Sequence, residues 1–190
     1  MNFAEVLAEV LRISGRPDKV TDATRAINMA VAFCTLKGEF KKDLVETSVT
    51  INPLLYGDTV SISSFTRYRR FKYVKPVAVR YYLTELDSDK IFIPRNAIQR
   101  DVYYVAGTSL TYTLGALAAS LEVAYYSYAP TLDAVTNNTY WMLDMMPFAI
   151  IDLAVARIFQ TIGDDASATR YQNSGMEFFI AAKNDSCMGM

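Results

Sequence analysis

The first segment of the chain has the hydrophobic spacing of an amphipathic α-helix. Asn2 is suited to cap this helix, and Glu5 follows three residues later, in the capping-box position. Gly15 suits the residue after the last turn, and Pro17 cannot continue a helix. The apolar positions of the predicted buried face are Phe3, Val6, Leu7, Val10 and Leu11.

A second helix is predicted between Thr21 and Gly38. The Thr21 hydroxyl can accept a hydrogen bond from a free N–H group of the first turn, and Gly38 closes the helix. The apolar face of this helix is narrower and consists of Ala23, Ile27, Ala30, Val31 and Cys34.

In the middle of the chain the spacing changes to the alternation that is typical of strands. All but one of the thirteen tyrosines lie between Tyr56 and Tyr140, where β-branched residues are also frequent. Short alternating runs separated by tight turns favour antiparallel pairing, so this region is predicted to form a small sheet or sandwich. The predicted strands are residues 44–51, 58–63, 75–83, 101–107, 109–115 and 120–130.

Helical spacing returns in the apolar stretch 140–159. Pro147 can begin a helix because its missing N–H is one that no helical carbonyl would bond. The predicted helix extends to about Ile162 and ends at Gly163.

A last helix is predicted over residues 166–183, capped by Asp164 or Asp165. The predicted buried positions include Tyr171, Phe178 and Phe179.

This order of elements predicts an α+β fold. The N- and C-terminal helices, residues 1–43 and 131–185, are predicted to pack as a helical bundle, with an inserted antiparallel β lobe at 44–130. Residues 186–190 are predicted to form a flexible C-terminal tail. The residues predicted to build the bundle are Trp141, Leu143, Pro147, Ile151, Val155 and Phe159.

The stretch 140–159 is also long enough to raise the question of a membrane span. It contains Asp144, Asp152 and Arg157. Each of these costs about 2.5–3.5 kcal/mol at the centre of a bilayer. Pro147 also interrupts the helix, so we expect a helix that is packed on several sides by protein and no membrane contact.

The composition excludes most catalytic and metal chemistry. The chain has no histidine, and its two cysteines, Cys34 and Cys187, are far apart. Ser-His-Asp triads and Cys₄ or His-containing zinc sites are therefore excluded, and no phosphate-binding glycine motif is present. The acidic residues of segment 84–90 are predicted to form a turn. We expect no enzymatic activity, no catalytic or metal-binding residue and no cofactor.

The segment 65–76 combines basic and aromatic residues, as single-stranded nucleic-acid binders do. The net charge of −1 gives no general support for such a role. Alternation along a strand would place Phe71 and Tyr73 on one face. Three interpretations remain open: a half-buried strand with a solvated face, a protein contact, or a nucleic-acid contact. The candidate contact residues for a neighbouring subunit or a tail protein are Arg67, Tyr68, Arg69, Arg70 and Lys72.

A longer pattern resembles a known family. "YYVAGTSLTYTLGALAASLEVAYYSYAPTL" (103–132) is followed by "NNTYWMLDMMPFAIIDLAVARIFQTIGDD" (137–165), and "RAINMAVAFCTLKGEFKKDL" (25–44) precedes both. This succession resembles the head-to-tail adaptors of tailed bacteriophages, the group that includes tail tubular protein A. The chain departs from the family at Phe148, where these proteins often carry an acidic residue after the proline.

The resemblance implies a structural virion protein, located in the neck or tail and in the host cytoplasm during assembly. Family members form a ring, usually of twelve copies, that binds the portal protein, extends the DNA channel and receives a tail nozzle or tube protein. Packaged DNA would pass without specific binding. Portal docking through the C-terminal segment would involve Ser186, Cys187, Met188 and Met190. The alternatives are another neck, tail-completion or minor capsid component, or a nucleic-acid-binding module.

Overall fold

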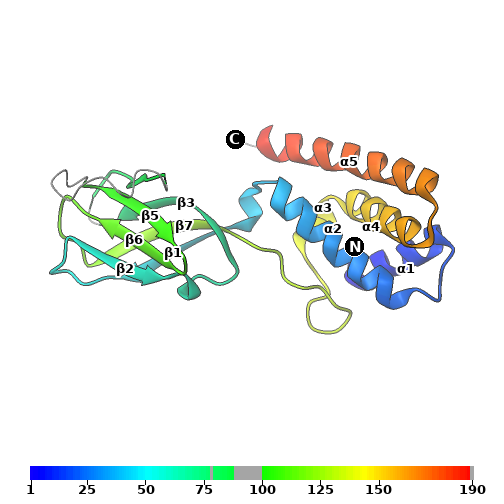
Figure 1. The fold of residues 1–190 in the computed structure, drawn as a ribbon, viewed down its shortest axis with the longest axis horizontal. Helices are drawn as coiled ribbons and strands as arrows, with labels where there is room; N and C mark the ends of the chain where they lie inside the picture. Colours follow the sequence, from blue (N-terminus) through cyan, green and yellow to red (C-terminus); the bar gives the residue numbers. More distant parts are fainter. Residues whose placement is uncertain (78, 88–99, 189–190) are drawn as a thin grey trace. The chain divides into compact units, whose positions relative to one another are not determined.

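A computed structural model describes residues 1–77, 79–87 and 100–188, with side chains described as far as Asn184 (Figure 1). The chain divides into two compact units. The helical unit consists of Met1–Asp43 and Tyr128–Met190, and the β unit consists of Leu44–Ser127. Helices and mainly antiparallel sheets confirm the predicted α+β class.

In the helical unit, helix α4 lies in the middle (Figure 1). Helix α5 packs along one side of it, and α1 and α2 pack along the other side. The apolar stretch is therefore a short helix, α3, followed by a helix that protein surrounds on several sides, as predicted. The elements of this unit are α1 (Phe3–Ser14), α2 (Val20–Lys37), the 3₁₀ turn η1 (Lys41–Asp43), α3 (Trp141–Met145), α4 (Pro147–Ile162) and α5 (Asp165–Met188).

The ends of three helices follow the predicted local signals. Asn2 and Glu5 form the capping box of α1. Gly163 has a φ of 80° at the end of α4, in the left-handed region that glycine adopts without a steric penalty. The Asp164 carboxylate accepts from the Ser167 N–H at 3.0 Å and so caps α5.

The start of α2 was predicted wrongly. The helix begins at Val20, and the residue before it, Lys19, makes no side-chain cap. The Lys19 N–H donates to the Arg16 carbonyl and so forms a turn. This turn directs the chain into the helix before Thr21 is reached. Thr21 therefore lies inside the first turn.

The core of the helical unit is formed by all its helices. Leu143, Ile151 and Val155 are buried, whereas Trp141, Pro147 and Phe159 are half-buried. The prediction for one aromatic residue of α5 was wrong, since Phe178 is 47% exposed. Successive residues of a helix point about 100° apart, so burial of Phe179 turns Phe178 away from the core. The buried and half-buried row of α5 contains Ala168, Tyr171, Gly175 and Phe179.

Residues 128–140, which connect β7 to α3, form no helix or strand, but hydrogen bonds to α2 and α1 hold them in place. The Asn28 side chain donates from Nδ2 to the Leu132 carbonyl at 3.0 Å and accepts from the Leu132 N–H at 2.7 Å. Six residues further on, the Asn138 carbonyl accepts from the Phe3 N–H at 2.7 Å. These bonds satisfy backbone groups that would otherwise be left unpaired beside the helices.

Between these two anchors, the Asp133 carboxylate closes a tight loop. It accepts hydrogen bonds from the N–H groups of Val135 and Thr136 and from the Thr136 hydroxyl. These bonds, those from Thr136 above all, lower the pKa of Asp133 to about 2.

We expect this loop to loosen in acid. A carboxylate whose folded pKa is depressed stabilises the fold above its unfolded pKa, and the contribution is lost as the pH falls through the folded pKa. The loop should therefore open between about pH 4 and pH 2. The Asp133 carboxyl ¹³C titration and amide exchange at Val135 measure this. The variant Thr136→Val should raise the pKa toward its ordinary value, and an ordinary pKa in the unmodified protein would contradict the prediction.

In the β unit, two sheets enclose one core. The three-stranded sheet has the order β1-β7-β3, and the four-stranded sheet has the order β2-β6-β5-β4. All pairs are antiparallel except β4 with β5. In the β1–β7 ladder, Leu44 lies opposite Tyr126. The strands are β1 (Leu44–Thr50), β2 (Gly57–Ser61), β3 (Tyr68–Pro76), β4 (Thr84–Glu85), β5 (Val102–Ala106), β6 (Ser109–Thr113) and β7 (Ser120–Ser127), with a 3₁₀ turn η2 (Ile62–Ser64).

The predicted strand 75–83 is wrong. The observed strand, β3, covers Tyr68–Pro76, and a turn follows it in which the Val79 N–H donates to the Pro76 carbonyl at 3.2 Å. This turn ends the ladder of β3, and residues 79–83 belong to no strand, although the Leu83 N–H still donates to the Val74 carbonyl at 2.8 Å. Part of the predicted strand, residue 78, lies outside the described residues.

Candidate interaction surfaces

Two irregularities in strand β3 decide which of its side chains face solvent. The register against β7 shifts between Tyr68 and Arg70 and again between Phe71 and Tyr73. Each shift adds one residue to β3 and reverses the alternation of its faces. Phe71 and Val74 consequently share the buried face, and Tyr73 lies on the other face. The prediction that Phe71 and Tyr73 share a face is wrong.

On the outward face, basic groups of β3 contact aromatic and acidic groups of the same sheet. The Arg69 and Arg70 guanidinium carbons lie 5.5 and 5.9 Å from the centre of the Tyr126 ring. Lys75 forms an ion pair with Glu122 at 3.0 Å. Cation–π and ion-pair contacts of this kind hold the basic side chains against the sheet.

Tyr73 lies on the same face, between two carboxylates. Its hydroxyl donates to Glu46 at 3.0 Å and to Glu122 at 3.3 Å. Burial, followed by the hydrogen bond to Glu46, raises the pKa of Tyr73 to about 12. Carboxylates therefore balance the basic groups of this face.

The five contact residues predicted in this segment fall in different environments. Tyr68 is half-buried and packs against the Phe71 ring, with centroids 4.6 Å apart, so it belongs to the core of the β unit. Arg69 and Arg70 lie over Tyr126, as described above. Arg67 and Lys72 are exposed.

A buried carboxylate in the helical unit organises the end of the N-terminal segment. Asp43 is 3% exposed, and its Oδ1 accepts from the Tyr140 hydroxyl at 2.6 Å and from Trp141 Nε1 at 2.7 Å. Burial and the hydrogen bond to Asp43 raise the pKa of Tyr140. Phe40 packs edge-on against Trp141, with centroids 4.8 Å apart. These contacts bring the residue before β1 against the start of α3.

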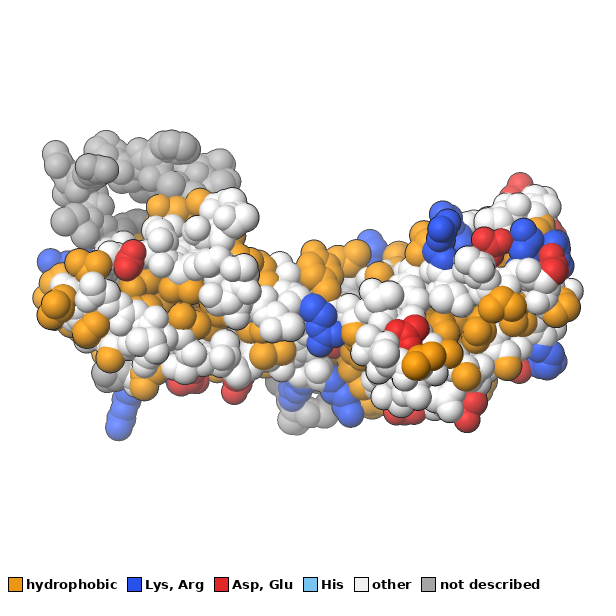
Figure 2. All heavy atoms as spheres, turned by 90° about the horizontal axis from the view of Figure 1, so that it is seen from below, with side chains coloured by type: hydrophobic (Ala, Val, Ile, Leu, Met, Phe, Trp, Pro, Cys, Tyr) orange, Lys and Arg blue, Asp and Glu red, His pale blue; other side chains and the backbone are white. Residues whose placement is uncertain are grey.

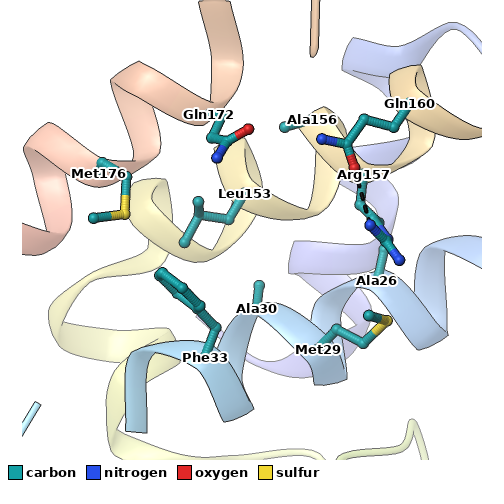
Figure 3. A pocket seen from close by; sticks show the side chains of 10 residues that line it. All are labelled: Ala26, Met29, Ala30, Phe33, Leu153, Ala156, Arg157, Gln160, Gln172 and Met176. Carbon is teal, nitrogen blue, oxygen red and sulfur yellow. Dashed lines mark hydrogen bonds between the residues drawn. The ribbon is translucent and has the colours of Figure 1, made fainter. Parts of the chain in front are cut away.

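A groove runs along the helical unit between α2, α4 and α5 (Figure 3). Its volume is about 190 Å³, and a smaller hollow beyond Met29 and Arg157 extends it. Figure 3 shows Phe33 and Met176 facing each other from α2 and α5, and Arg157 bonded to Gln160 at the other end. We call this the α2–α5 groove, lined by Ala26, Met29, Ala30, Phe33, Leu153, Ala156, Arg157, Gln160, Gln172 and Met176.

A second group of exposed apolar residues in the helical unit lies on α3, α4 and α5. Met145, Phe148 and Phe178 are 57%, 60% and 47% exposed. The Phe148 and Phe178 rings contact each other, with centroids 5.7 Å apart. We call these three residues the Phe148 ridge. Figure 2 shows further hydrophobic side chains at the surface of both units, among polar ones.

The C-terminal contact residues are only partly described. Helix α5 continues to Met188, beyond the predicted end at residue 183, so the chain is helical where a flexible tail was predicted to begin. Ser186, Cys187 and Met188 lie in its last turns, and their side chains are outside the described residues. Met190 lies outside them entirely.

The described part of the chain offers no metal site and no membrane-spanning helix. Among the described residues, no cluster of three or more His, Cys, Asp or Glu side chains is arranged to hold a metal ion. Within the same part of the chain, no helix has the length and hydrophobicity needed to cross a membrane. No protein-family model matches the chain, and no curated protein sequence matches it.

The sequence contained a signal for the groove and the ridge. Met29 and Phe33 are apolar residues of α2 that lie off the face formed by Ile27, Val31 and Cys34. An apolar residue outside the core face of a helix indicates a second packing surface. Phe148 is a similar signal, directly after the proline that begins α4.

Proposed function

We propose that this protein is a head-to-tail adaptor of a tailed bacteriophage, a structural ring subunit below the portal that extends the DNA channel and carries the tail. In this proposal, the helical unit is a bundle, the β unit is a lobe inserted into it, and the mature protein resides in the virion neck. Two features support the proposal: the resemblance carried by residues 25–44, 103–132 and 137–165, and the exposed apolar surfaces of the helical unit.

The observation that carries the proposal is the presence of two different apolar surfaces, the α2–α5 groove and the Phe148 ridge. Exposed apolar patches of this kind favour protein–protein contacts. A ring subunit needs two different surfaces, because each copy contacts one neighbour with one face and the other neighbour with another. An enzyme site has no comparable support among the groups described above.

The contacts on β3 weigh against nucleic-acid binding. Single-strand binders need basic groups that are open to the phosphate backbone. Here Arg69, Arg70 and Lys75 contact Tyr126 and Glu122 of the same sheet, whereas Arg67 and Lys72 are exposed. This balance of charge suits a wall along which DNA passes without being retained.

Mass measurement of the purified protein, with and without the portal protein of the same phage, tests the proposal. We expect a complex of twelve copies with the portal, in native mass spectrometry or multi-angle light scattering. A chain that stays monomeric and does not bind the portal would contradict the proposal. A ring that binds a tail component and not the portal would instead support another neck or tail-completion protein.

The C-terminal segment is the proposed portal contact. Its methionines are flexible apolar groups that can adapt to a groove on another protein. Deletion of residues 186–190 should abolish portal binding. The far-UV circular dichroism should lose only the signal of the last helical turn. Unchanged portal binding by the deletion variant would show that portal docking occurs elsewhere.

A further inference from the structure

A separate hollow of the helical unit differs from the α2–α5 groove in its lining. It lies where η1, α3 and α5 meet, and its volume is about 290 Å³. No carboxylate is among the residues that line it. We call it the Trp141 hollow, lined by Phe40, Lys41, Lys42, Trp141, Met145, Met146 and Ala182.

The interior of the Trp141 hollow offers apolar contacts. Phe40 packs edge-on against Trp141, and Met145 and Met146 add thioethers that adapt to the shape of an occupant. The Trp141 Nε1 group already donates to Asp43 at 2.7 Å, so the indole has no donor left for a ligand. For size, an engineered apolar cavity of about 150 Å³ binds benzene. The hollow therefore suits an apolar body somewhat larger than one ring.

The polar groups beside this interior are cationic. Lys41 and Lys42 line the hollow and are exposed, so their apolar stems contribute to the lining while their ammonium groups reach water at its mouth. Lys183 follows Ala182 in the chain and donates to the Lys37 carbonyl at 3.2 Å. This bond brings a further ammonium group to the end of α2.

The carboxylates of this region do not cancel the charge of the lining. Asp43 is buried and accepts the two hydrogen bonds described above. Asp144 is paired with the amine of Met1 at 2.7 Å. Glu39 is exposed and is not one of the lining residues. The lining itself therefore carries positive charge only, in a chain whose net charge is −1.

From the apolar interior and the cationic mouth we infer that the Trp141 hollow binds a small organic anion. The ligand has an apolar body of about one or two rings, or a short acyl chain, and one carboxylate or sulfonate group. Its body lies against Phe40, Trp141 and the two methionines, and its anionic group lies at the lysines. Ligand sites in proteins commonly combine an apolar lining with a few polar groups that orient the ligand. This site is not part of the proposed adaptor function and does not depend on it.

A fluorescent anion tests the inference on the full-length protein. Anilinonaphthalene sulfonate has two apolar ring systems and one sulfonate group. We expect it to quench the fluorescence of Trp141, the only tryptophan, in a saturable manner and to raise the melting temperature. Absence of saturable quenching would overturn the inference.

Replacement of the two lysines separates the charge from the apolar contact. The double variant Lys41→Gln, Lys42→Gln should weaken binding of the sulfonate about fivefold at low ionic strength. N-phenylnaphthylamine, which carries the same rings without the sulfonate, should bind both proteins equally. The control is Arg67→Gln, Lys72→Gln, which changes the net charge equally at exposed positions of the β unit and should leave binding of the sulfonate unchanged. Equal weakening in both double variants would contradict a role of the mouth lysines.

A filled hollow tests the location. Ala182→Leu places a larger side chain in the lining and should abolish binding of both probes, while circular dichroism shows an intact fold. Ala181→Leu is the matched control, because its position on α5 is exposed and does not line the hollow. Unchanged binding by the Ala182→Leu protein would show that the probes bind elsewhere, for example in the α2–α5 groove, and the inference would be wrong.

Discussion

Replacement of Asp43 by alanine is expected to lower the free energy of unfolding of the helical unit by roughly 3 kcal/mol. The substitution removes the acceptor of the Tyr140 hydroxyl and of Trp141 Nε1 and leaves both donors in a buried place. In a chain of this size the melting temperature should fall by roughly 6–12 °C. Trp141 is the only tryptophan, so its fluorescence during urea unfolding reports the free energy at the site directly.

Three further variants separate the hydrogen bonds from the charge. Asp43→Asn keeps an oxygen at the position of Oδ1 and should cost about half as much, because neutral acceptors bind less strongly. Tyr140→Phe removes one donor, and combined with Asp43→Ala it should cost less than the sum of the two single effects. Additive effects in this cycle, or a loss for Asp43→Ala below about 1 kcal/mol, would contradict a joint role for these groups.

The second large effect is expected at Gly175, where α5 lies close against α4. A Cβ added there would lie 2.9 Å from Leu153 Cγ, 3.1 Å from Leu153 N and 3.2 Å from the Ala149 carbonyl oxygen. Two of these atoms belong to the backbone of α4 and move only with the helix. Gly175→Ala should therefore destabilise the helical unit by about 1–3 kcal/mol, as measured by urea unfolding. Helix propensity alone would stabilise it by about 1 kcal/mol.

The control is Asn173→Ala, at an exposed position of the same helix. There the substitution adds helix propensity and no contact, so stability should rise by a few tenths of a kcal/mol. Opposite signs for the two alanine variants would show that packing against α4, and not propensity, decides the effect at Gly175. An increase in stability for both variants would contradict the close approach.

The features predicted correctly from the sequence are those in which neighbouring residues decide the structure. The capping box of α1 and the end of α4 at Gly163 involve atoms within a few residues of one another. The prediction was wrong for the faces of β3, because two register shifts against β7 reverse them. Alternation in the sequence cannot reveal such shifts, because the partner strand β7 determines where they fall. The start of α2 is an exception to this division, since the turn from Arg16 to Lys19 is as local as the capping box.

The same distinction holds for the interaction surfaces. The sequence shows that the basic residues of β3 lie close together. Their contacts with Tyr126 and Glu122 could not be predicted, because these two residues belong to a strand about fifty positions away. The Asp43 site is more remote still, since Asp43 and Trp141 are 98 positions apart. The hydrophobic spacing of a strand or a helix does not indicate that two residues so far apart in the sequence will form a hydrogen bond. The exposed Phe178 was assigned to the core because periodicity identifies apolar rows but does not select between adjacent aromatic residues.

The pairing of Leu44 with Tyr126 has a consequence for how such a chain can change over evolutionary time. The first residue of β1 and the end of β7 lie opposite each other, at a separation of about 5 Å between Cα atoms. The segment Leu44–Ser127 is therefore joined to the rest of the chain at two positions that are neighbours within the β1–β7 pair. A segment with neighbouring ends can be lengthened or exchanged without moving the residues on either side of it. It can also be deleted, because a tight hairpin turn would span the same gap. Sequence variation can then accumulate in one unit, while the residues that build the other remain unchanged.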